Sequence, residues 1–295
     1  MSRLFRYSNL DKNVLLREDA RELWPVADDL HSCALDGVED CPPDTPADLA
    51  WSNAHDGRFQ IALNGADWET PMESAEIFFQ SENLLTRIFG VKLDAYLQLH
   101  AAAVARPDGG AWLICGPSRA GKTSLALSLM LAGWNWLTDE LTLSGEHDPF
   151  RIHGFRRNFN LKESSWSSFP ETADLPHRRE SYSGYHKTRV RFIDPEALRP
   201  GSFQSSAPLE GILFPEYRSE ISAFATARLE GVAATQNLLP EITSPSASAF
   251  QMIAEWIRKV PAYRFEYANP RDIVPAIAAL DAPSRALLTQ LKRTP

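Results

Sequence analysis

Residues 116–123 (GPSRAGKT) have the side-chain types and the spacing that could bind phosphate, matching G-x-x-x-x-G-K-[ST] at every fixed position. In such a segment the glycines let the backbone approach phosphate oxygens, and the loop N–H groups form an anion-binding nest at the positive end of a helix. Lys122 would reach the β- and γ-phosphates, and the Thr123 hydroxyl would be a ligand of Mg²⁺. The predicted nucleotide-binding residues of this segment are Gly116, Pro117, Ser118, Arg119, Ala120, Gly121, Lys122, Thr123 and Ser124.

The sequence around this motif predicts the strand and the helix that the motif requires. Residues 111–115 (AWLIC) form an apolar run with the length of a buried strand. Residues 122–132 have apolar side chains on nearly every face, which is typical of a helix packed between layers, and Gly133 is expected to end it. Residues 135–143 (NWLTDELTL) predict a further strand. A strand, loop, helix and strand in this order predict an α/β layered core.

Two adjacent acids, Asp139 and Glu140, lie on the strand predicted directly after this helix. Phosphoryl transfer uses carboxylates to hold the metal and to accept the proton of the attacking hydroxyl. Neighbouring side chains of a regular strand point to opposite faces, so both acids can face the phosphates only where the strand ends or bends. The alternative is that one of them is a solvent-exposed charge at the edge of the strand.

Further candidates are a histidine and a row of cations. His100 lies in an apolar segment, where it can be either a hydrogen-bonded core residue or a group near the reacting phosphate. Lys187, Arg189 and Arg191 alternate with uncharged residues, which places them on one face of a strand. Lys187 or Arg189 could therefore bind a phosphate oxygen, although a solvated edge strand explains the same pattern. Lys162 has the same two interpretations.

The rest of the chain predicts further strands and helices. Residues 58–63 (RFQIAL) followed by Asn64-Gly65 are typical of a strand and a tight turn, and residues 72–89 have helical spacing with Gly90 as the expected stop. Residues 163–186 are rich in Ser, Glu, Arg, Gly and Pro, which predicts a long mobile loop that could close over a nucleotide. The remaining predicted strands are 95–105, 209–214, 224–229 and 263–267, and the remaining predicted helices are 248–260 and 273–280.

The composition limits the class of protein. Of 295 residues, 44% are hydrophobic and 23% are charged, close to the averages of globular proteins. The formal net charge of −8 gives no overall attraction to nucleic acid or to an acidic membrane, so neither is an expected partner. The 3 cysteines cannot all pair and lack the spacing of a zinc or redox site, which favours a cytoplasmic location. No segment has the length of a membrane span or the pattern of a secretory signal.

In these motifs the sequence resembles the C-terminal catalytic domain of the HPr kinase/phosphorylase family, and more closely its bacterial HPr kinase-related branch. The resemblance runs in order from His100 to Leu280. Its specific part contains Leu99-His100-Ala101-Ala102, the phosphate-binding loop or P-loop of residues 116–123, Gly133-Trp134 and Leu137-Thr138-Asp139-Glu140-Leu141. It continues more weakly through Phe159-Asn160-Leu161-Lys162, His186-Lys187-Thr188-Arg189, Phe214-Pro215-Glu216-Tyr217 and Tyr263-Arg264-Phe265-Glu266-Tyr267.

The resemblance implies an α/β fold with a P-loop kinase core of the HPr kinase type, in which a mixed sheet carries the P-loop helix. This kinase domain would be residues 95–295, after a smaller α+β region of residues 1–94. The implied activity is ATP- and Mg²⁺-dependent phosphorylation of a hydroxyl, usually serine on a small protein or peptide. The chain could also form a homo-oligomer. By position, Asp139 would be the general base, Glu140 and Thr123 would lie on the metal side, and His100 and Lys122 would lie close to the transferring phosphate.

Two features depart from the family: the second acid is Glu140 rather than Asp, and the downstream glycine-rich signature segment is missing. The sequence therefore assigns neither HPr as the acceptor nor a reverse, phosphate-removing reaction. One alternative is a small-molecule kinase or an enzyme like phosphoenolpyruvate carboxykinase, which shares an early acidic pair after its P-loop. The other is a regulatory switch that hydrolyses ATP slowly. Asp139 favours transfer over a switch, because an acceptor hydroxyl needs a nearby base.

Overall fold

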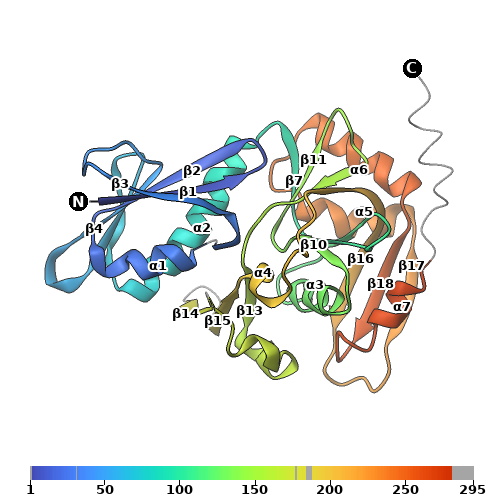
Figure 1. Cartoon of the computed structure of the whole chain (residues 1–295). Coiled ribbons are helices and arrows are strands. Elements are labelled where there is room, and N and C mark those ends of the chain that lie inside the picture. Colours follow the sequence, from blue (N-terminus) through green and yellow to red (C-terminus); the bar gives the residue numbers. More distant parts are fainter. Residues whose placement is uncertain (1, 31, 177, 184–187, 281–295) are drawn as a thin grey trace. The chain divides into compact units, whose positions relative to one another are not determined.

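The computed structural model describes residues 2–30, 32–176, 178–183 and 188–280 of a mixed α/β fold (Figure 1). The contacts divide the chain into two compact units. Unit 1 consists of Met1–Asp94 and Arg156–Gly201, and unit 2 of Ala95–Phe155 and Ser202–Pro295. Residues 156–201, which the predicted domain boundary places in the kinase domain, thus group with the N-terminal region.

Unit 1 is built on a six-stranded sheet in the order β3-β1-β2-β4-β5-β6. Its strands are β1 (Ser2–Asn9), β2 (Lys12–Glu18), β3 (Leu35–Cys41), β4 (Leu49–Asn53), β5 (Phe59–Leu63) and β6 (Ala66–Met72). Helix α2 (Ser74–Lys92) packs against β2 and β5, and the indole of Trp51 donates to the Ser81 hydroxyl at 2.8 Å. The short helices of this region are η1 (Arg21–Leu23), α1 (Trp24–Asp29), η2 (Ser32–Ala34) and η3 (His55–Gly57).

The predicted turn at Asn64-Gly65 is confirmed, because both residues have positive φ (50° and 83°) and Leu63 pairs with Ala66 across it. The predicted stop of α2 at Gly90 is wrong, since the helix continues to Lys92. The N–H of Leu93 still donates to the Phe89 carbonyl, and both of these side chains are buried. Burial of the last turn offsets the cost of about 1 kcal/mol for a glycine inside a helix.

Residues 156–201 are held to the N-terminal region of unit 1 by a buried ion pair. Arg157 Nε and Nη2 donate to the carboxylate of Glu82 on α2 at 2.9 and 2.5 Å, and the two side chains are 2% and 1% exposed. In addition, the backbone N–H of Arg156 donates to the side-chain oxygen of Asn9, and the side-chain amide of Asn158 donates to the backbone carbonyl of Asp29. Removing one partner of a buried pair costs about 3–5 kcal/mol, so these contacts are a physical reason for the grouping.

This part of unit 1 carries a second sheet in the order β13-β15-β14, with β13 (Phe159–Lys162), β14 (Arg179–Ser183) and β15 (Thr188–Ile193). The prediction of a long unstructured loop over 163–186 is wrong for the described part of that segment. It contains the 3-10 helices η4 (Glu163–Ser168) and η5 (Pro170–Thr172) before β14. The short helix α4 (Pro195–Leu198) follows β15 and is capped by the Asp194 carboxylate.

Unit 2 is built on a nine-stranded mixed sheet that contains the order β10-β8-β9-β16-β12-β11-β7. Strand β16 (Ser206–Tyr217) connects its parts, because it pairs with β12 (Arg151–His153) at its start, with β9 (Ala111–Ile114) in its middle and with β18 (Ala262–Tyr267) at its end. The β9 and β18 pairings are parallel. The carboxyl ends of β9, β16 and β18 therefore meet at one edge of the sheet. Strand β17 (Ala225–Leu229) extends β18 on its other side.

The segment predicted as one strand over 135–143 is two strands. β10 (Asn135–Thr138) pairs with β8 (Ala102–Ala105), whereas β11 (Leu141–Gly145) pairs with β7 (Tyr96–His100) and β12. Asp139 and Glu140 lie at the break, which is the condition under which both acids can turn toward one site. The predicted strand 95–105 is likewise divided, into β7 and β8.

The helices predicted over 122–132 and 248–260 are confirmed to within one residue at each end, whereas a helix over 231–238 was not predicted. Helix α3 (Lys122–Leu131) packs against β8, β9 and β10, and Gly133 follows it at φ 102°. Helices α5 (Gly231–Leu238) and α6 (Ala247–Lys259) bury Leu238, Ile253 and Trp256 in a core shared with alternate residues of the sheet. The predicted C-terminal helix is shorter than expected, as α7 (Val274–Ala278). No helix in the described ranges is long and apolar enough to cross a membrane.

Candidate functional site

The 116–123 loop leaves the carboxyl end of β9 and enters α3 directly. Cys115 N donates to Leu213 O on β16 at 2.9 Å, which fixes the start of the loop to the parallel part of the sheet. Pro117, Ser118 and Arg119 are exposed at its tip, and Ala120 N closes a turn onto Pro117 O at 3.1 Å. In parallel α/β sheets this edge, outside the carboxyl ends of the strands, is where ligands bind.

The second half of the loop packs tightly against two tyrosines. Gly121 has φ 101°, and a Cβ at this position would lie 2.3 Å from the hydroxyl oxygen of Tyr267. That hydroxyl donates to Gly121 O at 3.3 Å from the end of β18. Tyr217, at the end of β16, donates its backbone N–H to Ala120 O at 3.3 Å. Only glycine satisfies both the backbone angle and the space at position 121.

The predicted lysine and threonine begin α3. Lys122 is buried, and its ammonium group donates to Gly116 O at 2.5 Å, so the side chain folds back along the loop. The Thr123 hydroxyl donates to Asp139 Oδ2 at 3.2 Å. Asp139 is only 2% exposed. The structure thus brings the first of the two acids onto the start of the helix.

The second acid contacts the predicted histidine. His100 Nε2 lies 3.2 Å from Glu140 Oε1, and His100 Nδ1 lies 3.2 Å from Glu241 Oε2. Glu241 comes from the 3-10 helix η6 (Leu239–Glu241), which is held against β7 by a bridge between Ile242 and Leu99. Each nitrogen of the imidazole therefore contacts a carboxylate, and the two carboxylates come from different elements.

These contacts set the charge of the imidazole. The hydrogen bonds to Glu140 and then Glu241 raise the pKa of His100 to about 9, while burial and the charge of Lys122 act in the opposite direction. His100 therefore carries a proton at neutral pH, within reach of the Lys122 charge. Glu241 is a site residue that sequence reasoning missed, because nothing in its local sequence (LLPEI) distinguishes it from a surface glutamate.

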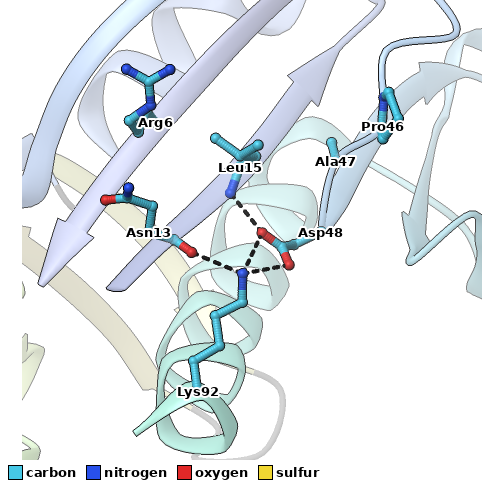
Figure 2. Close-up of a pocket in the computed structure, with 7 residues that line it drawn as sticks. All are labelled: Arg6, Asn13, Leu15, Pro46, Ala47, Asp48 and Lys92. Atoms are coloured by element: carbon cyan, nitrogen blue, oxygen red, sulfur yellow. Dashed lines mark hydrogen bonds and ion pairs between the residues drawn. The ribbon is translucent and has the colours of Figure 1, made fainter. Parts of the chain in front are cut away.

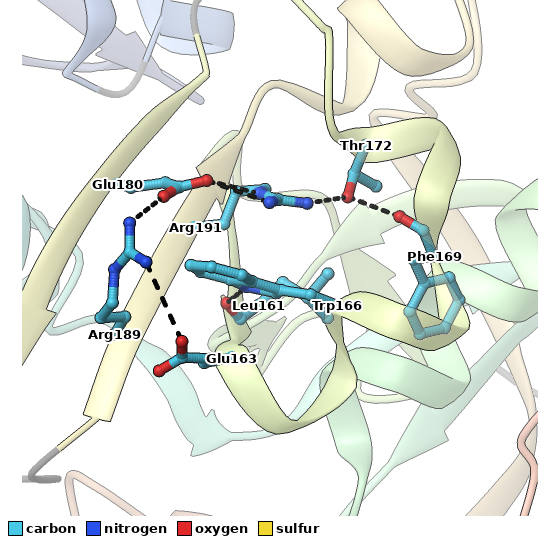
Figure 3. Close-up of polar contacts among 8 residues, drawn as sticks. All are labelled: Leu161, Glu163, Trp166, Phe169, Thr172, Glu180, Arg189 and Arg191. Atoms are coloured by element: carbon cyan, nitrogen blue, oxygen red, sulfur yellow. Dashed lines mark hydrogen bonds and ion pairs between the residues drawn. The ribbon is translucent and has the colours of Figure 1, made fainter.

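Of the cations predicted on one strand face, Arg189 and Arg191 lie in unit 1 and form their own network (Figure 3). Arg189 Nη2 and Arg191 Nη2 bond to the carboxylate of Glu180 at 2.5 and 3.0 Å, and Arg191 also donates to the Thr172 hydroxyl at 2.9 Å. Both guanidinium groups lie over the ring of Trp166. The strand is central in its sheet, so the edge-strand interpretation is wrong. Lys187 lies outside the described residues, and Lys162 ends β13.

A shallow groove of about 430 Å³ in unit 1 lies between β2, the segment before β4 and the end of α2 (Figure 2). Its main polar groups are already paired: Lys92 Nζ bonds to Asp48 Oδ1 at 2.7 Å and to Asn13 O at 2.8 Å, and Asp48 Oδ2 accepts from Leu15 N at 2.8 Å. These bonds fasten the end of α2 to β2. The groove contains none of the residues predicted for chemistry.

Proteins that this chain is similar to are found among solved structures. No family model and no curated protein matches the chain. Among solved structures, the chain is similar to the Hpr(Ser) kinase/phosphatase from Coxiella burnetii, with a TM-score of 0.32 and 11% sequence identity over 66% of this chain and 98% of that chain. A similarity of this degree carries no argument about activity.

Proposed function

We propose that unit 2 binds ATP with Mg²⁺ on the 116–123 loop and transfers the terminal phosphoryl group to a hydroxyl, most simply a serine or threonine of a small protein or peptide. The observation that carries this proposal is the bond from Thr123 to Asp139. It joins a complete phosphate-binding motif to an acid from the next strand. The Glu140–His100 pair follows directly at the same break between β10 and β11.

The oxygen atoms at the start of α3 suit a magnesium ion. Mg²⁺ prefers oxygen ligands, keeps several waters and is usually held by one or two side chains together with substrate phosphates. Thr123 and Asp139 supply a hydroxyl and a carboxylate 3.2 Å apart. When bound, the ion would neutralise charge on the phosphate oxygens. No group of three or more His, Cys, Asp or Glu side chains in the described ranges is arranged to hold a metal by itself.

The contacts favour different roles for Asp139 and Glu140. Asp139 is buried beside Thr123, which suits a metal-side carboxylate, whereas 37% of the Glu140 side chain is exposed. An acceptor hydroxyl arrives from solvent, so we assign Glu140 as the group that accepts its proton. A carboxylate can accept from the imidazolium of His100 and still bind a hydroxyl, because its two oxygens offer about four lone-pair sites. This assignment exchanges the two roles that the family resemblance implies.

Positive charge around the moving phosphoryl group is the second requirement of transfer. Lys122 supplies one charge by turning from Gly116 O toward the phosphates, and the loop N–H groups and the N-terminus of α3 add partial positive charge. The protonated His100 is offset by the carboxylates of Glu140 and Glu241, so its role here is to hold Glu140 in place and not to add positive charge. Arg189 belongs to unit 1, where it is paired with Glu180, and its binding to phosphate stays a prediction from the sequence alone.

The proposal is tested with the full chain and ATP labelled on the γ-phosphate, incubated with candidate acceptor proteins and analysed by mass spectrometry. Label on a serine or threonine supports the proposal. Label on a small molecule would instead identify a small-molecule kinase, and release of free phosphate alone would identify a slow hydrolase acting as a switch. Lys122→Ala is the binding control and should abolish tight ATP binding in a folded protein. Normal ATP affinity in this variant would contradict the loop assignment.

A further inference from the structure

Tyr217 is fastened to the 116–123 loop and is nevertheless exposed to solvent. It ends β16 and pairs in register with Tyr267 of β18. Its backbone N–H donates to Ala120 O at 3.3 Å, and its Cβ lies 3.8 Å from the position of a Cβ on Gly121. The two tyrosines differ in burial, since Tyr267 is 1% exposed and Tyr217 is 52% exposed.

The ring of Tyr217 is held in place by its neighbour. It meets the ring of Tyr267 edge to face, with centroids 6.4 Å apart and an angle of 70° between the planes. Tyr267 is itself anchored through its hydroxyl on Gly121 O. An aromatic ring that is held by a neighbour and is half exposed offers an apolar surface beside the loop proposed to hold the phosphates.

The charges around this ring exclude a second phosphate site. Arg218 is paired with Glu216 at 2.5 Å, with Glu266 at 3.4 Å and with Glu220 at 3.9 Å, and Arg264 pairs with Glu266 at 3.7 Å. The three carboxylates thus outnumber the two guanidinium groups, and the net charge of this cluster is negative. A neutral, flat group suits this surface better than an anion does.

We infer that Tyr217 is the platform on which the base of the bound nucleotide stacks, an inference that rests on the proposed binding of a nucleoside triphosphate by the loop. The phosphates and the base of one nucleotide would then lie on adjacent surfaces, the loop and the ring, that share the backbone bond from Tyr217 to Ala120. Stacking on an aromatic side chain contributes about 1–3 kcal/mol per base and tolerates different bases. The site should therefore accept ATP and GTP with similar affinity.

The test compares three ligands, ATP, GTP and inorganic tripolyphosphate, by isothermal titration calorimetry in the presence of Mg²⁺. Tyr217→Ala should weaken binding of ATP and GTP by about 5- to 140-fold, which is 1–3 kcal/mol at 1.4 kcal/mol per decade. Binding of tripolyphosphate, which has no base, should be unchanged. Tyr217→Phe should retain wild-type affinity because the ring remains. Phe250→Ala, which removes another exposed aromatic ring of unit 2, is the matched control and should change nothing.

The outcomes separate this inference from the proposed function. If the wild-type chain binds neither ATP nor tripolyphosphate, the loop assignment fails. If the wild type binds both and Tyr217→Ala binds ATP normally, the stacking inference alone is overturned. Equal weakening of ATP and tripolyphosphate would show that Tyr217 only supports the loop. An increased KM for the acceptor with unchanged ATP affinity would show that the ring binds the acceptor instead.

Discussion

The hydroxyl of Thr123 donates to the carboxylate of Asp139 across 3.2 Å, which links the first turn of α3 to the break between β10 and β11. Glu140, the next residue along the chain, makes its contact with His100 instead. Two adjacent acids therefore have different partners, and their substitution should have different consequences.

We expect Asp139→Asn to raise the Mg²⁺ concentration needed for nucleotide binding, because it removes a charge beside Thr123. Thr123→Ala should do the same, and the double variant should be less impaired than the sum of the two, since the residues are in contact. Glu140→Gln should keep the affinity for nucleotide and metal but lower the transfer rate by about 10²- to 10⁴-fold.

Calorimetry at varied Mg²⁺ and a transfer assay measure the two effects, with Glu146→Gln in the exposed turn after β11 as the control. If Asp139→Asn loses only rate and Glu140→Gln loses metal affinity, the roles implied by the family resemblance are the right ones. If neither substitution changes transfer, the pair is structural and the proposed mechanism is wrong.

The charge of His100 can be measured directly. Its pKa is raised from 6.5 to about 9, so its NMR signals should titrate near pH 9, and Glu241→Gln should move that titration to lower pH by removing one of the two carboxylates. His153 is an internal control, because burial and Arg151 lower its pKa below the usual value and Glu241→Gln should not affect it. A His100 pKa near the ordinary value of 6.5 in the wild type would show that Glu140 and Glu241 do not both bond to the imidazole.

The same shift has a consequence for stability. A pKa raised in the folded state means that the folded chain binds the proton more tightly than the unfolded chain does. The stabilising contribution of His100 is therefore complete below about pH 6.5 and is lost as the pH rises toward about 9. His100→Gln should flatten this part of the stability profile.

A buried carboxyl in unit 1 gives a second pH-dependent prediction. Glu18 is fully buried, its Oε1 accepts from Ala20 N at 2.6 Å, and its Oε2 has no hydrogen-bond partner among the described residues. Burial raises the pKa of Glu18 from 4.5 to about 8. The folded chain thus holds a proton that the unfolded chain releases, so stability should fall as the pH rises from about 4.5 to about 8.

Glu18→Gln should remove this loss and stabilise the chain at pH 8, because the amide keeps the acceptor for Ala20 without a buried charge. Denaturant unfolding at pH 5 and pH 8 measures the effect. Glu76→Gln, which changes an exposed glutamate of α2, should leave the difference between the two pH values unchanged. An equal pH dependence in wild type and Glu18→Gln would show that Glu18 is charged in the folded state.

The sequence predicts the features that depend on local patterns. The run AWLIC, the glycines of the loop and the all-round apolar α3 identify the strand, turn and helix because each pattern lies within one element. The turn between β1 and β2 carries no such signal, since its first residue is Leu10 at φ 52°, a conformation that leucine rarely adopts.

The features that sequence reasoning missed depend on long-range contacts. Glu241 reaches His100 because η6 is bridged to β7, and Arg157 reaches the N-terminal region through its ion pair with Glu82 on α2. The sequence identifies Arg189 and Arg191 as cations on one face of a strand. Their shared partner Glu180 was missed, because it lies on a strand inside a segment whose composition predicts a loop. A periodic pattern identifies a face of a strand and not the group opposite it.

The final prediction concerns two glycines that flank α3 with nearly the same backbone angle. Gly121 has φ 101° and Gly133 has φ 102°, but a Cβ at Gly121 would lie 2.3 Å from the Tyr267 hydroxyl, whereas a Cβ at Gly133 would meet nothing within 4 Å. Gly133→Ala should therefore cost only the strain of a left-handed residue, about 1–2 kcal/mol of stability, with unchanged nucleotide affinity. Gly121→Ala should cost this strain and also displace the loop, which weakens nucleotide binding.

Tyr267→Phe provides the rescue that identifies the cause. It removes the hydroxyl that an alanine Cβ would strike, at the cost of the bond to Gly121 O. Gly121→Ala combined with Tyr267→Phe should therefore recover nucleotide affinity relative to Gly121→Ala alone, as measured by calorimetry with thermal unfolding as a check of the fold. If Gly133→Ala weakens nucleotide binding as much as Gly121→Ala, backbone strain at the ends of α3 controls the site. If the double variant shows no recovery, the close approach of Tyr267 is not what requires glycine at position 121.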